Sequence, residues 1–399
     1  MTASPPSVVI AGAGYAGLHV AQRLGTWLDR SRQATITLVD RNDYHQLRTE
    51  LPRVASGQRA DEKVRVDVDT VLPESVTFRQ GSITGFDLAE HYVFLDGQPV
   101  PYWRLVLALG SRPNDFHIPG LADRALLMWS ADDAVRIRRA VEHSVAEAAQ
   151  ASSPAKRNRL LTVVIGGGGA TGVELAGAFA EELPKMASKH GIAGAEPRVI
   201  IVEAGHTILA ASSPELVRKA LDILERLRVE VLTNSAIVEA TADGFKLAHG
   251  RLVTGGTFIW AGGVKAAEIV GGSGFEVGYN GRIKVDRYLR ALGHETVYVA
   301  GDVASVPDPA TGMSLPPLAQ TALSEGESVA ENLRNELEGK QVESFHLRSK
   351  GFVVSVGARR GVANVSGMTF GGSLAHALKD AIEWEYRNSI KYLRGWAAG

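Results

Sequence analysis

The chain opens with a short apolar run, a glycine turn and a series of apolar positions at helical spacing. Residues 7–14 read SVVIAGAG, and apolar side chains then recur every three or four residues from Leu18 to Leu28. An apolar run of this length predicts a buried strand, and the recurrence predicts an amphipathic helix. The next apolar run, ATITLVD, ends at Asp40. These segments together predict the strand, helix and parallel strand that open a doubly wound sheet.

The same order of elements recurs in the middle of the chain. The run RLLTVVIGGGG is followed by the helical pattern GVELAGAFAEELPKMA and by a strand, RVIIVE, that ends at Glu203. Gly12 and Gly167 occupy equivalent positions in the two units. Short β-rich runs separated by Gly and Asp follow each unit and predict a small antiparallel meander. The repeat therefore covers a whole half of the chain, and it predicts an α/β fold with two Rossmann-like, three-layer dinucleotide-binding domains.

The pattern changes after Phe345. Two β-rich runs, GFVVSVGA and GVANVSG, precede a long helical pattern that begins at Ser373. Most of its apolar side chains form one row at intervals of four residues, and Leu393, Trp384 and Trp396 are further apolar residues of this segment. The row consists of Leu374, Leu378, Ile382, Tyr386 and Ile390. Because the charges of this helix are mixed in sign, the amphipathic pattern fits contact with lipid, packing on the protein body or the interface of a homodimer.

Composition narrows the chemistry that such domains can carry. The 399 residues are 45% hydrophobic and 22% charged, with a formal net charge of −1. This is a globular composition without the basic field that a nucleic-acid partner requires. No cysteine is present, which excludes disulfides and thiol chemistry, so electron transfer here needs a bound organic cofactor. No HExxH, EF-hand or P-loop pattern occurs, and we expect no catalytic metal.

The first residues and the lengths of the apolar segments limit where the protein can be located. The first residues, MTASPPS, contain no Lys or Arg and no apolar core, so we expect no signal peptide there. No apolar stretch reaches the roughly 18 residues of a membrane-spanning helix. We therefore expect the protein in the cytoplasm or, as a peripheral protein, on the cytoplasmic face of the cell membrane.

The first glycine turn has the spacing of a dinucleotide-binding motif. Gly12, Gly14 and Gly17 fit GxGxxG between a strand and a helix, which is the context that this motif needs. The first glycine makes the tight turn, the second lets the backbone approach a pyrophosphate and the third lets helix and strand pack closely. Asp40 follows at the end of the next strand, where an acid binds the ribose hydroxyls.

The second turn repeats this motif with Gly167, Gly169 and Gly172, and Glu203 is its ribose acid. An acid at that position repels a 2′-phosphate, so we expect NADH rather than NADPH. Glu174 lies two positions after the last glycine, on the first turn of the predicted helix. Two interpretations of Glu174 stay open: a carboxylate that complements the helix dipole, or a contact to the nicotinamide end of NADH.

A third candidate site precedes a predicted helix from Ala319 to Leu337. Pro316 and Pro317 stand just before it, an arrangement that fixes a helix start. The N-terminus of a helix stabilises negative charge, such as the charge that a flavin gains on reduction. Two interpretations of Gln320, in the first turn of this helix, stay open. It is either a helix-start polar residue exposed to water or, beside such a flavin, a contact to the flavin and the electron acceptor.

These residues resemble the pyridine nucleotide oxidoreductase superfamily with two Rossmann domains, and most of all its type II NADH:quinone oxidoreductases. The resemblance is carried by FHIPGL after LGSRPN, by FIWAGGV and by PPLAQTALSEG. The last stretch is similar to a quinone-site motif, AQxAxQxG, matched by Ala319, Gln320, Ala322 and Gly326. Ser324 stands where the motif has a second glutamine, which leaves the quinone contacts and the acceptor open.

The resemblance implies FAD as cofactor, NADH as substrate and a membrane quinone as electron acceptor, without proton pumping. It implies that FAD is bound by Gly12, Gly14, Gly17, Asp40, Gly110, Asp302, Ala319 and Gln320. It implies that NADH is bound by Gly167, Gly169, Gly172, Glu174, Glu203 and Gly262. The implied catalytic residues are Glu174 and Gln320, together with Lys379 of the C-terminal helix, which approaches Glu174. That helix is implied to bind the membrane.

The expected domains are a discontinuous FAD-binding domain, an inserted NAD(H)-binding domain and a C-terminal segment for membrane docking or dimerisation. Their limits are 1–115 with 285–345, then 116–284, then 346–399. A polar stretch, residues 148–158, is predicted to be an exposed loop or a boundary. Two other functions stay open: a soluble NADH-dependent reductase of ferredoxin, rubredoxin or another carrier, and an NADH-binding flavoprotein that acts as a sensor or interaction partner with little turnover.

Overall fold

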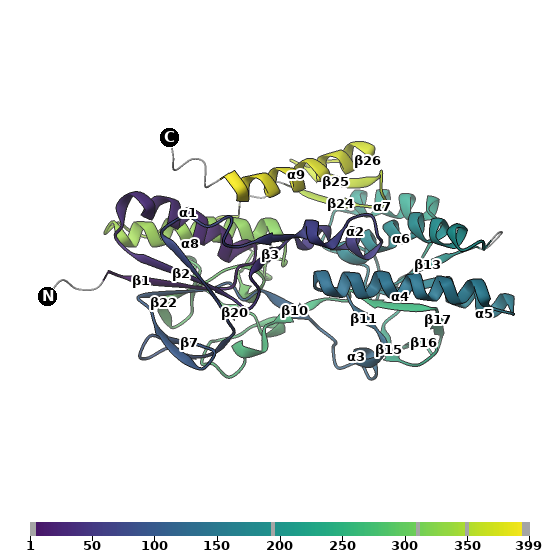
Figure 1. Cartoon of the computed structure of the whole chain (residues 1–399), viewed down its shortest axis with the longest axis horizontal. Coiled ribbons are helices and arrows are strands. Elements are labelled where there is room, and N and C mark those ends of the chain that lie inside the picture. The colour runs from purple at the N-terminus through teal and green to yellow at the C-terminus, as the bar shows by residue number, and fades with distance from the viewer. Residues whose placement is uncertain (1–4, 193–195, 309–311, 348–350, 393–399) are drawn as a thin grey trace.

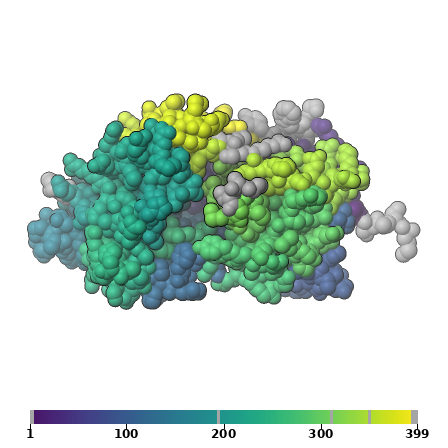
Figure 2. Space-filling view, turned by 180° about the vertical axis from the view of Figure 1, so that it is seen from behind, coloured from purple at the N-terminus to yellow at the C-terminus, as the bar shows by residue number. Residues whose placement is uncertain are grey.

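Two parallel sheets organise the chain, and each carries one of the repeated glycine turns (Figure 1). The structure is a computed structural model, and it describes residues 5–192, 196–308, 312–347 and 351–392. From behind, the teal and green lobes lie side by side with a recess between them, and the yellow C-terminal segment runs along the top (Figure 2). The expected α/β fold with two Rossmann-like domains is confirmed.

The first sheet has six strands, and its centre is completely buried. In order across the sheet they are β21 (Arg290–Ala291), β22 (His294–Val299), β9 (Arg104–Leu107), β1 (Ser7–Ala11), β2 (Thr35–Asp40) and β5 (Val76–Gln80). Ile10 of β1 pairs with Leu38 on one side and with Val106 on the other. Helices α1 (Tyr15–Ser31) and α8 (Ala319–Leu337) pack against each other beside this sheet. The strand order reverses at β1, and a reversal of this kind places a ligand crevice at the strand's carboxyl end.

The second sheet repeats this plan with five strands. Their order is β11 (Leu126–Leu127), β18 (Thr257–Trp260), β12 (Thr162–Gly166), β13 (Arg198–Val202) and β14 (Val229–Leu232). Its order reverses at β12, the counterpart of β1. The accompanying helices are α4 (Ala131–Gln150), α5 (Pro154–Leu160), α6 (Ala170–Lys189) and α7 (Pro214–Arg226). The topology therefore predicts one ligand crevice for each sheet, next to its own glycine turn.

Antiparallel elements decorate and connect the two sheets. The two predicted meanders are β6 (Ile83–Asp87), β7 (Tyr92–Leu95) and β8 (Gln98–Pro101), and β15 (Ile237–Ala240), β16 (Gly244–Leu247) and β17 (Leu252–Thr254). Where the chain passes between the lobes, β10 (Ser111–Pro113) pairs with β19 (Val264–Ala266). Smaller elements are β3 (Tyr44–Gln46), β4 (Arg65–Asp67), β20 (Ile283–Lys284), β23 (Ala304–Ser305), α2 (Leu51–Ala55) and α3 (Leu121–Arg124). The 3-10 turns are η1 (Arg48–Glu50), η2 (Asp61–Val64), η3 (Glu268–Val270), η4 (Tyr279–Gly281) and η5 (Gly301–Val303).

The prediction of a loop at residues 148–158 is wrong for most of that stretch. Helix α4 continues to Gln150, and α5 begins at Pro154. The polar residues that suggested a loop are helix-start residues: the side chain of Ser153 accepts a hydrogen bond from the backbone N–H of Lys156, and proline occupies the first helical position. Both features are typical of a helix N-terminus, so they break the chain for only a few residues.

The C-terminal segment forms a small sheet covered by a helix. Strands β24 (Phe352–Ser355), β25 (Gly361–Val365) and β26 (Met368–Gly372) contact α6 and α7, and α9 (Ser373–Tyr392) packs on them. Helix α9 crosses the top of the molecule toward the first lobe (Figure 1). Within the described ranges, none of the helices combines the length and hydropathy that crossing a bilayer would need.

The predicted apolar row of α9 does not form a single buried face. Leu374 and Ile382 are 66% and 46% exposed, whereas Ile390 is buried and Tyr386 is mostly covered. Trp384 is also 66% exposed. The inward face also carries charged residues, because η1, α2 and α6 supply opposite charges to it. Leu393 and Trp396 lie outside the described residues.

Candidate active site

The two glycine turns have the same backbone geometry. Gly12 has a φ of +111° and Gly167 a φ of +116°, values that only glycine adopts readily. The N–H of Gly12 donates to the carbonyl oxygen of Val39 at 2.7 Å, and that of Gly167 donates to Val202 at 2.8 Å. Each turn is thus fixed to the strand that leads to its predicted ribose acid.

The second and third glycines of each turn serve different purposes. A β-carbon at Gly17 or Gly172 would lie 1.9 Å from the carbonyl oxygen of the turn's own first glycine, so close packing requires glycine there. A β-carbon at Gly14 or Gly169 would meet no atom of the described residues within 4 Å. These two residues are the N-caps of α1 and α6, where backbone N–H groups attract anions. The open space at both N-termini fits a dinucleotide pyrophosphate.

An acid is fixed beside each turn by backbone donors. Asp40 Oδ2 accepts from the N–H of Ala13 at 2.8 Å, and Glu203 Oε2 accepts from the N–H of Gly168 at 2.6 Å. A second backbone N–H holds the other oxygen of each carboxylate. Both carboxylates are therefore oriented before any nucleotide binds.

Asp302 stands just after the end of β22, across from Ser111. The hydroxyl of Ser111 donates to Asp302 Oδ2 at 2.6 Å. Gly110, just before Ser111, has a φ of +67°, and a β-carbon there would have open space around it out to 4 Å within the described part of the chain. The connection between the lobes therefore meets the turn formed by Gly301 and Asp302, which follows strand β22 of the first sheet.

Helix α8 begins at Ala319, as the sequence predicts, and is tied to the same turn. Ala319 and Gln320 are half-buried at its start. Further along, Glu325 Oε2 accepts from the backbone N–H of Gly301 at 2.5 Å. Glu325 is completely buried, and burial raises its pKa to about 8. The helix is thus anchored by a residue that sequence reasoning missed.

Gly262 lies beside the second turn. A β-carbon at Gly167 would approach the Cα of Gly262 to 2.8 Å, and one at Gly262 would strike the ring of Trp260. The end of β18 therefore borders the crevice of the second sheet.

Arg48 is a cation near the first crevice that sequence reasoning also missed. Its guanidinium lies 3.6 Å from the ring centroid of Trp129. Burial lowers the pKa of Arg48, while the carboxylates of Asp302 and Asp40 oppose that shift. Positive charge is therefore held close to both acids of the first crevice.

The structure brings Glu174 and Lys379 into direct contact, although they lie on α6 and α9. Lys379 Nζ donates to Glu174 Oε1, and the backbone N–H of Ser355 donates to the same oxygen at 3.1 Å. Both side chains are buried. A small cleft adjoins them, lined by Thr49, Arg53, Gln58, Glu174, Ser355 and Lys379.

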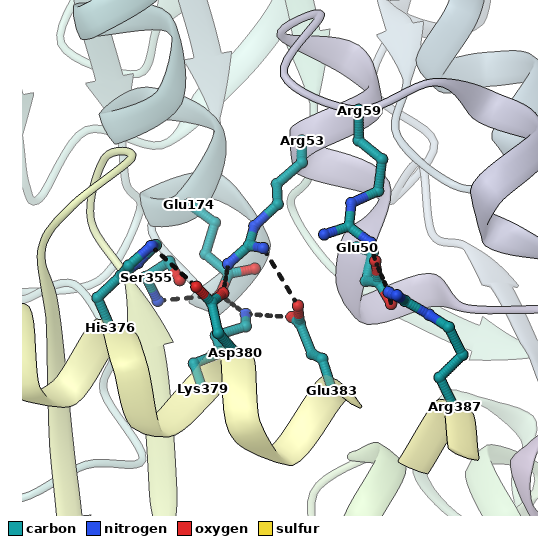
Figure 3. Close-up of polar contacts among 10 residues, drawn as sticks. All are labelled: Glu50, Arg53, Arg59, Glu174, Ser355, His376, Lys379, Asp380, Glu383 and Arg387. Atoms are coloured by element: carbon teal, nitrogen blue, oxygen red, sulfur yellow. Dashed lines mark hydrogen bonds and ion pairs between the residues drawn. The ribbon is translucent and has the colours of Figure 1, made fainter. Parts of the chain in front are cut away.

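This contact belongs to a larger group of charges between α2, α6 and α9, which we call the charge cluster (Figure 3). Its members are Glu50, Arg53, Arg59, Glu174, His376, Lys379, Asp380, Glu383 and Arg387. Arg387 Nη2 donates to both oxygens of Glu50 at 2.5 and 2.6 Å, and Arg59 also contacts Glu50. Arg53 donates to Asp380 at 2.5 Å. The inward face of α9 is therefore held by ion pairs.

Comparisons with known proteins agree with this geometry. The sequence profile of the pyridine nucleotide-disulphide oxidoreductases matches residues 6–326. The type II NADH:quinone oxidoreductase of Staphylococcus aureus (strain NCTC 8325 / PS 47) is 32% identical over 380 residues, which cover 94% of each chain. That of Staphylococcus haemolyticus (strain JCSC1435) is also 32% identical with the same coverage. The chain belongs to the type II NADH:quinone oxidoreductases.

Solved structures show the same fold. NDH2 from Plasmodium falciparum in complex with NADH superposes with a TM-score of 0.84 at 17% identity, covering 98% of this chain and 97% of that one. The sulfide:quinone oxidoreductase of Aquifex aeolicus gives a TM-score of 0.79 at 18% identity, with 97% and 92% covered.

The wider family is named for a disulphide, which this type II member cannot form because it has no cysteine.

The sequence of this chain contains two further local signals, for the site residues Glu325 and Arg48. An acid stands at Glu325 between Ser324 and Gly326, and Arg48 lies in a segment rich in charge, RTELPR. Among the described residues, no group of His, Cys, Asp and Glu is arranged to hold a metal ion.

Proposed function

We propose that this chain passes hydride from NADH to FAD and then two electrons to a quinone, without pumping protons. The observation that carries the proposal is the pair of glycine turns, each with open space at its helix N-terminus and a fixed acid beside it. FAD, when bound, supplies the two-electron chemistry, and the side chains bind and orient. Membership of the type II NADH:quinone oxidoreductases supports the assignment of donor and acceptor.

The residues divide between two nucleotides. We assign the first crevice to FAD, held by Gly12, Gly14, Gly17, Asp40, Gly110, Asp302, Ala319 and Gln320. We assign the second to NADH, held by Gly167, Gly169, Gly172, Glu174, Glu203 and Gly262. The matching domain limits are 1–115 with 285–345 for FAD and 116–284 for NADH, and the two sheets support this division.

Glu174, Lys379 and Gln320 are assigned to the meeting place of donor and acceptor. Glu174 orients the nicotinamide end, and Lys379 fixes the Glu174 carboxylate through their direct contact. Gln320 lies in the first turn of α8, whose N-terminal dipole favours negative charge beside it.

The outward face of α9 supports peripheral contact with the cytoplasmic face of the membrane. Leu374, Ile382 and Trp384 are large apolar side chains exposed on one helix, while Lys379 and Glu383 of that helix turn inward. Exposed apolar patches of this kind mark contact with lipid or with another protein. A homodimer through the same face is the competing arrangement.

The function is tested with purified protein, NADH and a series of acceptors under anaerobic conditions. NADH is expected to bleach the flavin absorbance, and a short-chain quinone is expected to restore it faster than oxygen does. Faster recovery with ferredoxin or rubredoxin would favour a soluble reductase. Tight binding of NADH without bleaching would favour a sensor and would refute the proposed reaction.

A further inference from the structure

Quinone reduction by NADH has a proton requirement that the donor alone does not meet. A hydride from NADH carries two electrons and one proton, whereas a quinone that becomes a quinol gains two electrons and two protons. One more proton must come from the medium in each turnover. This inference rests on the proposed function and concerns the route of that proton.

Glu383 and Glu50 are two buried carboxylates of the charge cluster with opposite surroundings. Glu50 accepts two hydrogen bonds from Arg387 and contacts Arg59 as well. Neither carboxyl oxygen of Glu383 has a hydrogen-bond partner among the described residues, although both are shielded from solvent. A buried carboxylate without hydrogen bonds is poorly stabilised in its charged form. Glu383 is therefore the member of this pair that readily carries a proton.

Two cations lie within ion-pair distance of Glu383. Glu383 Oε1 lies 3.7 Å from Lys379 Nζ, and Oε2 lies 3.5 Å from Arg53 Nη1. Lys379 is thus within ion-pair distance of both Glu383 and Glu174. The charged or titratable groups that face Glu383 are Lys379 on its own helix, Arg53 on α2, Glu50 on η1, Glu174 on α6 and Tyr15 on α1.

We propose that Glu383 holds the second proton and delivers it to the Lys379 and Glu174 pair. When Lys379 donates a proton to the quinone, an N–H bond of Lys379 breaks and an O–H bond of the quinol forms. The O–H bond of Glu383 then breaks and the N–H bond of Lys379 re-forms. Glu383 is then reprotonated from solvent on the side of Asp380, whose side chain is 47% exposed and bound to Arg53. No electrons move in this step, so it adds only the proton that the overall reaction lacks.

The electrostatic balance at Glu383 agrees with this assignment. Burial raises its pKa to about 7, while the positive charges of Lys379 and Arg53 oppose the shift. A group of that pKa both holds and releases a proton near neutral pH, which is the condition for efficient proton transfer. Because Glu383 acts through Lys379, it is a positioning and proton-holding residue rather than a group that touches the quinone.

The test separates the two half-reactions of the full-length, FAD-loaded protein. NADH-reduced protein is mixed with a short-chain quinone between about pH 5.5 and 9, and flavin absorbance is followed. In the wild type the reoxidation rate should fall above about pH 7, as Glu383 loses its proton. Glu383→Gln should remove this fall in rate near pH 7 and slow reoxidation at about pH 6 on the order of 100-fold. Its reduction by NADH should stay within about twofold of the wild type.

Glu385→Gln is the matched control, because it makes the same change of side chain at an exposed position of the same helix. It should keep the wild-type pH profile. If the Glu383→Gln protein keeps the fall in rate near pH 7, the inference about Glu383 is wrong and the proposed function is unaffected. Wild-type protein that shows no fall in rate between about pH 6 and 8 would also overturn the inference, even if the variant failed to fold. Wild-type protein that no quinone reoxidises would overturn the proposed function and this inference together.

Discussion

The hydroxyl oxygen of Tyr386 lies 3.0 Å from Nε2 of His45. The other ring nitrogen of His45, Nδ1, lies 2.9 Å from the carbonyl oxygen of Ala13 in the first glycine turn. Because a carbonyl only accepts, Nδ1 carries the hydrogen, and because burial keeps the ring neutral, Nε2 accepts from the tyrosine. The imidazole therefore joins the C-terminal helix to the loop that we assign to FAD, and it does so in its neutral form.

His45 makes the stability of the fold sensitive to acid. Burial lowers its pKa to about 4, below the ordinary value of about 6.5. Between these values the unfolded chain binds a proton at this residue and the folded chain does not. The contribution of His45 to the free energy of unfolding is therefore fully present above about pH 6.5 and is lost as the pH drops toward about 4. The loss is on the order of 3 kcal/mol at most. Urea unfolding across this pH range should show it, and His45→Asn should flatten that slope. An equally steep slope in the variant would assign the acid sensitivity to other groups.

How much of this could be predicted depends on how local each signal is. The strand, turn and helix around Gly12 follow from periodicity within some thirty residues, and α8 begins and ends at the predicted Ala319 and Leu337. The faces of α9 could not be assigned this way. Its inward residues are charged because their partners are distant: Lys379 meets Glu174 across 205 positions, and Arg387 meets Glu50 across 337. No local pattern records such pairs.

The Glu174 and Lys379 contact should show strong coupling between its partners. Lys379→Met leaves a buried carboxylate with one backbone donor, and breaking a buried ion pair from one side costs roughly 3–5 kcal/mol. The double variant Glu174→Gln, Lys379→Met removes both charges and should be more stable than Lys379→Met alone. Urea unfolding of the wild type, both single variants and the double variant measures the coupling. Additive effects would mean that the two groups do not stabilise each other.

Glu203 should set the preference for NADH. Glu203→Gln keeps an acceptor for the N–H of one glycine but removes the charge that repels a 2′-phosphate. The ratio of kcat/KM for NADH to that for NADPH should fall at least about tenfold, equivalent to roughly 1.4 kcal/mol. Asp40→Asn, the same change at the first turn, is the control and should leave that ratio unaltered. An equal fall in both variants would contradict the assignment of the two crevices.

Variants of the outward face of α9 should show whether this face contacts lipid or a second copy of the chain. Replacing Leu374, Ile382 and Trp384 with Glu adds charge to side chains that are already exposed, so the fold should tolerate it. We expect the wild type to float with vesicles of mixed anionic and neutral lipid and the triple variant to stay in solution. Ser389→Glu, at an exposed site on the same helix, is the control for added charge. If flotation is unchanged while a dimer dissociates, the face is a protein interface.

The glycine turns allow ligand binding and folding to be separated at neighbouring positions. Alanine at Gly14 or Gly169 would contact no atom of the described residues, so these variants should fold and yet obstruct the space assigned to a pyrophosphate. Gly14→Ala should purify with little FAD, whereas Gly169→Ala should keep its yellow colour and resist bleaching by NADH. Alanine at Gly172 would lie 1.9 Å from a backbone oxygen, so that variant should lose stability instead. If Gly169→Ala is bleached normally, the second turn does not bind NADH. If Gly14→Ala retains FAD and Gly169→Ala loses it, the two crevices have been assigned in the wrong order.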